Sequence, residues 1–253
     1  MGIATDIKLL YHLALRPVRG KDHAARMEDF YKGQAGAYDD FRKRLLKGRE
    51  EMYQSLDWPD GAVWVDLGGG TGSNLECVAE QVPRLSQVYV VDLAESLLKV
   101  CEERAAQRGW ANVTARAADA TTFMPPERAA DVVTFSYSLT MIPDWFAAID
   151  NALAMLRPGG QIGVVDFYVS RKHAEADRKR HSFATRHFWR TWFDGDSVYP
   201  SPDHVPYLTQ RFEKTRLEER RARIPYLPLV RAPYYIFTGR KAEVGSRKEG
   251  FPA

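Results

Sequence analysis

The chain has 253 residues and a mass of 28.8 kDa, with 45% hydrophobic, 27% charged and 12% aromatic residues. These values are ordinary for a globular protein and exclude fibrous and intrinsically disordered classes. A chain of this length can bury roughly 70–75% of its extended surface around one core, so we expect one large domain. No apolar run reaches about 18 residues and no secretory signal is encoded, so the sequence predicts a cytoplasmic protein.

The net charge is only +3, from 36 basic and 33 acidic residues, but the basic residues are unevenly placed. Residues 171–192 hold seven Lys or Arg against two acids, interleaved with three histidines and several aromatic residues. Anionic lipid and nucleic acid are both attracted by such a segment, and a solvated helix face is an equally good interpretation. The segment by itself therefore does not identify a partner.

Two helical segments are expected before residue 58. Apolar residues recur at helical spacing in residues 3–16, which predicts a short amphipathic helix that ends at Pro17. A second, charge-rich helical region covers residues 22–56 and ends at the turn-like WPDG of 58–61.

Between residues 58 and 242, strand-like and helix-like segments alternate, which predicts parallel pairing through right-handed crossovers. The segments typical of strands are residues 62–67, 86–93, 113–119, 130–138 and 161–170. The segments typical of helices are 73–81, 94–108 and 144–156, and RPGG at 157–160 is typical of a turn. Two alternating runs, 215–224 and 232–241, indicate an antiparallel hairpin at the sheet edge. The fold expected is a doubly wound α/β sheet with its ligand at the carboxyl ends of the strands.

These segments divide the chain into three parts. We expect a helical lid or membrane-docking segment at 1–57, an α/β domain at 58–242 and a disordered tail at 243–253. Cys77 and Cys101 fall in helix-like segments and are expected to pack as small apolar groups, without a disulfide. No metal site is expected.

The most informative segment is VWVDLGGGTGSN at residues 63–74, in which a strand ends in an acid and a glycine turn follows. Gly68, Gly70 and Gly72 allow the backbone to turn tightly against a ligand. Their G-x-G-x-G spacing differs from the dinucleotide fingerprint G-x-G-x-x-G, which holds a pyrophosphate. Asp66 would repel a phosphate but attract a cationic ligand with an amino group, and S-adenosylmethionine is such a ligand.

Two further acids follow the next two strands. Asp92 ends the second strand, 24 residues after Gly68, where its carboxylate can take both hydroxyls of a ribose. Asp119 follows the third strand, beside Ala120, and can accept a hydrogen bond from an adenine amino group. Each acid can also be read as a helix N-cap, which Asp commonly is, but three acids in this order favour a nucleoside site.

The DLGGGTG turn, the VVDL segment, Asp119 and the LRPGG turn resemble the class I S-adenosylmethionine-dependent methyltransferases. The resemblance implies a seven-stranded Rossmann-like sheet whose last strand is antiparallel, with S-adenosylmethionine as cofactor. The residues then expected to bind the cofactor are Gln34, Tyr38, Asp66, Gly68, Gly69, Gly70, Thr71, Gly72, Asp92, Leu93, Asp119, Ala120 and Ser136.

A narrower resemblance covers about residues 27–240 and includes FYKGQAGAYDDFRKRLLKGRE (30–50), TFSYSLTMIPDW (134–145), HFWRTWF (187–193) and IPYLPLVRAPYYIFTGR (224–240). These strings are similar to the methyltransferase part of betaine lipid synthases. That family trimethylates the amino group of diacylglyceryl-homoserine to give diacylglyceryl-trimethylhomoserine. Many eukaryotic members carry a second domain that transfers the homoserine moiety, and 253 residues leave no room for it. The resemblance therefore implies a separate partner enzyme that supplies the homoserine lipid.

Methyl transfer from a sulfonium to nitrogen is an in-line displacement, so catalysis consists mainly in aligning an unprotonated amine with the methyl carbon. Tyrosine faces can hold the methylated cation, which at a desolvated site is worth about 2 kcal/mol or more. The candidates are Tyr31, Tyr38, Tyr137 and Tyr168, with Tyr137 preferred. His187 and Asp166 are the candidate proton acceptors. Core packing, or lipid contact for His187, is an equally reasonable role for these side chains.

A diacyl lipid stays in its membrane, so we expect the enzyme to dock peripherally on an anionic membrane surface. Residues 3–16 and 171–192 can supply the apolar insertion and the charge attraction. The alternatives are a methyltransferase of phosphatidylethanolamine, a methyltransferase of a small soluble amine or other metabolite, and a nucleic-acid-binding module with a vestigial nucleotide fold. We favour methylation of the amino group of diacylglyceryl-homoserine over these alternatives and expect no nucleic-acid partner.

Overall fold

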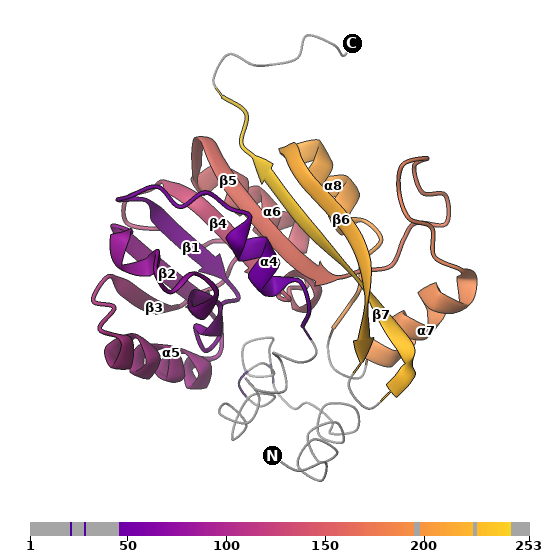
Figure 1. The fold of residues 1–253 in the computed structure, drawn as a ribbon, viewed down its shortest axis with the longest axis horizontal. Coiled ribbons are helices and arrows are strands. Elements are labelled where there is room, and N and C mark those ends of the chain that lie inside the picture. Colours follow the sequence, from indigo (N-terminus) through magenta and orange to yellow (C-terminus); the bar gives the residue numbers. More distant parts are fainter. Residues whose placement is uncertain (1–20, 22–27, 29–45, 195–197, 225–226, 244–253) are drawn as a thin grey trace.

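The computed structural model describes residues 21, 28, 46–194, 198–224 and 227–243. Its centre is a seven-stranded sheet with the order β3-β2-β1-β4-β5-β7-β6 (Figure 1). The strands are β1 (Val63–Leu67), β2 (Gln87–Asp92), β3 (Val113–Ala117), β4 (Ala130–Ser136), β5 (Leu156–Phe167), β6 (Glu213–Ile224) and β7 (Leu227–Arg240). The helix expected at residues 3–16 and most of the helical region at 22–56 lie outside the described residues.

The pairing of the strands confirms the predicted fold class. Strands β1 to β5 pair in parallel, whereas β7 is antiparallel to both β5 and β6. The predicted hairpin of 215–224 with 232–241 is the β6–β7 pair. Because β1 has β2 on one side and β4 on the other, the crossovers diverge there and open a crevice at the carboxyl ends of the strands.

Helices cover both faces of the sheet, with α4, η1 and α5 on one face and α6 and α8 on the other (Figure 1). The helices of the described residues are α4 (Arg49–Gln54), α5 (Glu95–Arg108), α6 (Trp145–Met155), α7 (Phe183–Asp194) and α8 (His204–Arg211). Three short 3₁₀ helices are η1 (Ser73–Val78), η2 (Val82–Arg84) and η3 (Leu139–Met141). The sequence patterns had not indicated α8.

The segment after the glycine turn differs from its prediction, because residues 73–81 contain the 3₁₀ helix η1 in place of an α-helix. Ser73 and Asn74 open this helix, and both side chains accept hydrogen bonds from the Arg49 guanidinium. Ser and Asn favour such side-chain bonds over regular helix, which is the physical reason for the difference.

The RPGG segment at 157–160 is also not an isolated turn, since it lies within β5. The Gly159 N–H donates to the Lys241 carbonyl at 2.9 Å, and the Lys241 N–H donates to the Gly160 carbonyl at 2.9 Å. Pairing with the chain that leaves β7 therefore holds these residues in the sheet, although Gly159 has a φ of 76° and the register with β4 shifts between the Ala130–Leu156 and Val132–Gln161 pairs.

All five residues of β1 are buried, and their side chains alternate between two apolar layers. Val63, Val65 and Leu67 contact the layer that contains α6, whereas Trp64 contacts the layer that contains α4. Asp66 shares the face of Trp64 because side chains along a strand alternate. The sheet thus places a carboxylate inside an apolar layer, where it needs hydrogen-bond donors.

Candidate active site

The turn after β1 requires glycine at two positions for steric reasons. Gly68 and Gly72 have φ of 71° and 66°, in the left-handed region that other residues rarely adopt. A Cβ on Gly68 would stand 2.3 Å from Ser138 Cβ, and a Cβ on Gly72 would stand 2.6 Å from Cys101 Sγ. The turn is therefore pressed against the segment after β4 and against α5, at the edge of the crevice.

Asp66 lies beneath this turn and is 0% exposed. Its carboxylate accepts hydrogen bonds from the hydroxyls of Tyr53 (3.0 Å) and Thr134 (2.7 Å) and from the amide of Asn74 (2.8 Å). Burial raises the pKa of the Asp66 carboxyl, and these three hydrogen bonds oppose the rise. The geometry contradicts the predicted contact between Asp66 and a ligand, because no surface of the carboxylate is exposed. Asp66 instead orders the glycine turn from below.

Asp92, the last residue of β2, holds the opposite side of the turn. Its Oδ2 accepts from the Gly70 N–H at 3.0 Å and its Oδ1 accepts from the Ala94 N–H at 3.0 Å. The helices that follow Asp66 and Asp92 begin after Gly72 and Ala94, and neither has a side-chain cap. Reading these two acids as helix N-caps is therefore wrong.

Asp119 lies on the loop after β3 and is exposed. Its Oδ1 accepts from the backbone N–H and the hydroxyl of Thr121, both at 2.8 Å. The neighbouring Ala120 is held by its carbonyl, which accepts from the Asn151 side-chain amide at 3.0 Å. The local bonds give Asp119 a defined direction while leaving its Oδ2 available to a ligand.

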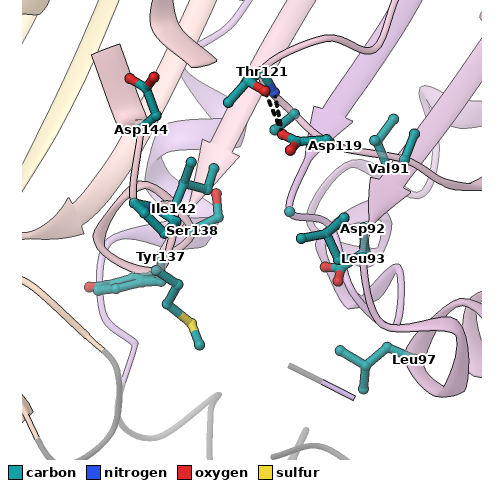
Figure 2. Close-up of a pocket in the computed structure, with 15 residues that line it drawn as sticks. Val91, Asp92, Leu93, Leu97, Asp119, Thr121, Tyr137, Ser138, Ile142 and Asp144 are labelled. Atoms are coloured by element: carbon teal, nitrogen blue, oxygen red, sulfur yellow. Dashed lines mark hydrogen bonds between the residues drawn. The ribbon is translucent and has the colours of Figure 1, made fainter. Parts of the chain in front are cut away.

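A cavity of about 240 Å³ lies at the carboxyl ends of β1, β2, β3 and β4. Figure 2 shows Tyr137, Ser138 and Ile142 on one side of it, facing Asp92 and Asp119 on the other. The cavity is lined by Gly68, Val91, Asp92, Leu93, Leu97, Ala118, Asp119, Ala120, Thr121, Tyr137, Ser138, Met141, Ile142, Pro143 and Asp144. The apolar walls fit a nucleobase and the carboxylates fit hydroxyl and amino groups. None of these described lining residues is Lys or Arg, so the site suits a cationic nucleoside better than a phosphate.

The predicted cofactor residues divide into three groups. Gly68, Asp92, Leu93, Asp119 and Ala120 line the cavity. Six others lie behind it and do not line it, namely Asp66, Gly69, Gly70, Thr71, Gly72 and Ser136. Gln34, Tyr38 and the catalytic candidate Tyr31 lie outside the described residues.

Ser136 was predicted to contact the cofactor but does not line the cavity. It is the last residue of β4, is 2% exposed, and its hydroxyl has no partner among the described residues. Ser138, two residues further on, lines the cavity and donates to the Leu67 carbonyl at 2.8 Å. The contact predicted at Ser136 thus falls to Ser138.

Residues 65–160 match the family model described as methyltransferase domain. The fold is similar to that of the N-methyltransferase NodS from Bradyrhizobium japonicum in complex with S-adenosyl-L-homocysteine, with a TM-score of 0.63. That likeness covers 88% of this chain and 100% of NodS at 16% identity. Residues 65–160 therefore carry a methyltransferase domain. S-adenosylmethionine is the cofactor of this domain.

Curated relatives of the methyltransferase domain include demethylmenaquinone methyltransferase from Anoxybacillus flavithermus, which is 28% identical over 120 residues. That match covers 47% of this chain and 51% of the relative, so the chain spans about half of the relative's length. The ubiquinone/menaquinone biosynthesis C-methyltransferase UbiE from Cupriavidus taiwanensis is 24% identical over 244 residues, covering 91% of this chain and 98% of the relative. The similarity thus extends beyond the domain at low identity.

In the methyltransferase domain, Tyr137 follows β4 directly and lines the cavity. Its φ is 56°, a left-handed conformation that costs a non-glycine residue on the order of 1–3 kcal/mol. The hydroxyl donates to the Lys47 carbonyl at 2.6 Å, and the ring packs edge-on against Phe167. Burial raises the pKa of the Tyr137 phenol well above its ordinary value, so it stays protonated. The ring therefore serves as a wall, and the hydroxyl as an anchor.

We expect Tyr137→Phe to lower the free energy of unfolding by about 1 kcal/mol, because only the bond to Lys47 is lost. Its affinity for S-adenosylhomocysteine should stay within about threefold of the wild type. Tyr137→Ala removes the wall and should weaken binding by about tenfold or more. Denaturant unfolding and calorimetry measure both effects. A tenfold loss of affinity in Tyr137→Phe would show that the hydroxyl contacts the cofactor.

Asp166, a candidate proton acceptor, is 0% exposed and does not line the cavity. Its carboxylate accepts from the Thr140 hydroxyl (2.8 Å), the Thr140 N–H (3.1 Å) and the Phe167 N–H (2.7 Å). The predicted catalytic role is contradicted, because a buried group behind η3 cannot reach an acceptor in the cavity. Asp166 instead positions η3, which connects to the cavity wall at Met141 and Ile142.

Burial raises the pKa of Asp166 from 3.8 to about 7, so the folded chain binds this proton more tightly than the unfolded chain. The stabilisation by this proton is complete below about pH 4 and is lost as the pH rises through about 7. Across this pH range we expect the free energy of unfolding of the wild type to fall by up to about 1.4 kcal/mol per pH unit relative to that of Asp166→Asn, because the Asn amide does not titrate. Denaturant unfolding at about pH 5 to 8 tests this, and parallel stability curves would contradict it.

His187, the other candidate proton acceptor, is exposed on α7 and does not line the cofactor cavity. Its ring lies 4.2 Å from that of Phe183, and it lines a separate cavity beside α7. Among the described residues, His187 therefore has no contact with the cofactor cavity. The candidate Tyr168 is 2% exposed and lies away from the cofactor cavity, against Tyr235.

The structure adds lining residues that the motifs did not single out, chiefly Met141, Ile142, Pro143 and Asp144. Their signal was available, since TMIPD follows the fourth strand directly and so had to lie at the carboxyl edge. Within the described residues no group of three or more His, Cys, Asp or Glu could hold a metal ion. In the same part of the chain, no helix is both long and apolar enough to cross a membrane.

Proposed function

We propose that this chain transfers the methyl group of S-adenosylmethionine to the amino group of a membrane lipid. The acceptor we propose is diacylglyceryl-homoserine, and the product of three rounds is diacylglyceryl-trimethylhomoserine. The observation that carries the proposal is an aromatic cleft next to the cofactor cavity, flanked by a helix with exposed aromatic and basic residues. The resemblance to betaine lipid synthases supports the choice of head group.

In the cofactor cavity, we propose that Asp92 accepts from the ribose hydroxyls, since its carboxylate lines the cavity while its backbone bonds hold it still. Asp119 and Ala120 then flank the adenine, and Gly68 faces the amino-acid end. The cofactor supplies an electrophilic methyl group on sulfur. The protein positions an amine lone pair in line with that methyl and excludes water, which accounts for most of the acceleration in such displacements.

The aromatic cleft is the proposed acceptor site, with a volume of about 750 Å³. It shares Ile142 and Pro143 with the cofactor cavity, so a group in the cleft is adjacent to the cofactor. Trp145, Phe146 and Tyr199 line it. Aromatic faces attract a quaternary ammonium, and the cleft thereby suits an acceptor whose positive charge becomes permanent as methylation proceeds.

Helix α7 is the proposed membrane contact. Phe183, Phe188 and Trp192 are 69%, 43% and 41% exposed, and Arg186 and Arg190 lie on the same helix. Exposed aromatic residues next to cations are typical of helices that lie in the interface of an anionic membrane. We propose that the enzyme associates peripherally with such a surface, where residues 1–57 can add a further contact.

We expect the triple variant Phe183→Ser, Phe188→Ser, Trp192→Ser to float with vesicles of phosphatidylcholine and phosphatidylglycerol at least tenfold less than the wild type, because burial of three large apolar side chains is lost. Met124→Ser is the matched control, since Met124 is 39% exposed on the loop after β3. Unchanged flotation of the triple variant would remove α7 from the membrane contact.

The deciding experiment offers labelled S-adenosylmethionine to the purified protein with diacylglyceryl-homoserine, phosphatidylethanolamine, free homoserine and a demethylmenaquinol, each lipid in neutral detergent micelles. The quinol represents the second candidate, because the curated relatives carry the names of quinone methyltransferases and an aromatic cleft can also stack a ring. Label in the homoserine lipid supports the proposal. Label in the quinol or the soluble amine, with none in the amino lipids, would overturn it.

We propose that a separate enzyme supplies the homoserine lipid. Cells that lack both activities should accumulate a quaternary-ammonium lipid when they express this chain together with a homoserine-transferring partner, and should not accumulate it with this chain alone. Accumulation without the partner would contradict the proposed head group. RNA should compete for the protein no better than a polyanion of equal charge.

A further inference from the structure

A second polar feature lies beyond the aromatic cleft, at the side of α7. It is a cavity of about 220 Å³, and its basic lining residues are Arg171, Lys172, Arg186, His187 and Arg190. None of the described residues that line it is acidic. Arg171, Lys172, His187 and Arg190 are exposed, so this set of basic side chains without carboxylates generates a positive potential at the surface beside α7.

Two of these cations already have partners. Arg171 donates to the Asp203 carboxylate at 2.6 Å, and Arg186 donates to the His181 carbonyl at 3.1 Å. Lys172 and Arg190 form no ion pair with any described residue. Arg186 is held by a neutral carbonyl, so its charge and those of Lys172 and Arg190 have no carboxylate partner among the described residues, and the side chains of Lys172 and Arg190 also have no hydrogen-bond partner there.

The wall of the cavity is held by local bonds. The Ser170 N–H donates to His181 Nδ1 at 3.0 Å, and the His181 N–H donates back to the Ser170 hydroxyl at 2.8 Å. Arg186 and Arg190 are four residues apart on α7 and so share a helix face. The strand end after β5 and helix α7 are thereby fixed on opposite sides of the cavity.

The basic cavity borders the proposed acceptor site. Arg190 and Pro202 line both the basic cavity and the aromatic cleft, and the cleft shares Ile142 and Pro143 with the cofactor cavity. The three spaces thus lie next to one another in the order cofactor cavity, aromatic cleft and basic cavity.

We propose that Lys172 and Arg190 form a subsite for the carboxylate or phosphate of an amphiphile whose amino group lies in the aromatic cleft. This subsite rests on the proposed function, because it assigns the acceptor a negative charge in addition to its amine. Arg presents paired donors to a planar or tetrahedral anion, and Lys adds a mobile point charge. The subsite thereby selects zwitterionic head groups over neutral amines.

The test compares Lys172→Gln/Arg190→Gln with the control Arg84→Gln/Lys214→Gln, which removes the same charge. Lys214 is the second residue of β6 and pairs with Gly239 of β7, which pairs in turn with Ile162 of β5, at the opposite end of these strands from α7 (Figure 1). The probes are a carboxylate-bearing amino lipid and its methyl ester, both in neutral detergent micelles. We expect KM for the free carboxylate to rise at least about tenfold in the subsite variant and KM for the ester to stay unchanged, with no change in the control.

The second arm identifies the source of the anion. Loss of binding to phosphatidylglycerol vesicles by the subsite variant, with unchanged KM in neutral micelles, would assign these two cations to a surrounding lipid phosphate and would overturn the head-group subsite. Unchanged KM together with unchanged vesicle binding would overturn it. If the wild type methylates no amino lipid, the proposed function fails, and titration with inorganic phosphate then tests the subsite alone. Phosphate binding that the subsite variant loses and the control keeps supports it, and equal binding by both variants overturns it.

Discussion

Asp66→Ala is expected to lower the free energy of unfolding by about 3 kcal/mol or more in the absence of any cofactor. The substitution leaves the hydroxyls of Tyr53 and Thr134 and the amide of Asn74 without an acceptor inside the apolar layer. Each unsatisfied buried donor costs about 1–3 kcal/mol. Part of this sum is offset because the variant no longer buries a carboxylate, which itself costs free energy. Denaturant unfolding of the cofactor-free protein measures the loss.

The matched control is Asp60→Ala, which removes an exposed ion pair with Arg84 and should cost less than about 1 kcal/mol. The comparison separates two roles of Asp66. If Asp66 acts only by contact with the cofactor, its replacement leaves the stability of the cofactor-free protein unchanged. If Asp66 orders the turn, its replacement lowers that stability. Equal stability of Asp66→Ala and the wild type would therefore show that the positioning role is wrong.

Asp92→Ala is expected to weaken binding of S-adenosylhomocysteine by about 100-fold or more. The change removes the acceptor that holds the Gly70 and Ala94 N–H groups and, by the proposed mode, the acceptor of the ribose hydroxyls. Hydrogen bonds to a charged group are worth about 1.5–3 kcal/mol each, so two of them account for the factor. Calorimetry measures the affinity, and the loss of the ligand-induced rise in Tm gives an independent reading.

Asp119→Ala provides the comparison within the same cavity. Asp119 is exposed and holds only Thr121, so its loss should weaken binding by about tenfold or less. We therefore expect a larger loss of affinity for S-adenosylhomocysteine in Asp92→Ala than in Asp119→Ala. An Asp92→Ala protein that binds within threefold of the wild type would refute the proposed ribose contact.

Much of the cofactor side of the site could be predicted from local pattern. Apolar runs mark the strands, and the carboxyl ends of parallel strands meet at one edge, so Asp92, Asp119 and Gly68 were expected together and line one cavity. Tyr137 was predicted there for the same reason. The acceptor side was harder to predict, since Trp145 and Phe146 begin α6 whereas Tyr199 comes from a distant segment, and only long-range packing brings them together.

The predictions for Asp66 and Asp166 failed for the same reason. Asp66 is one residue inside the end of β1, and Asp166 one residue inside the end of β5, so both side chains point into packed layers. Asp92 is the last residue of β2 and reaches the edge. A shift of one residue exchanges the faces of a strand, and sequence patterns place strand ends less accurately than that.

The amino-acid sequence by itself determined the α/β order, the glycine turn and the nucleoside chemistry of the acids, because these depend on neighbouring residues and on the period of apolar side chains. Tertiary structure alone decided which acids reach the cavity and which are buried, since that depends on the partners across the sheet. It also decided that Arg190 stands between an aromatic cleft and a basic cavity. Local sequence carries no information about contacts between β5, α7 and the loop before α8, so the acceptor side emerged from packing.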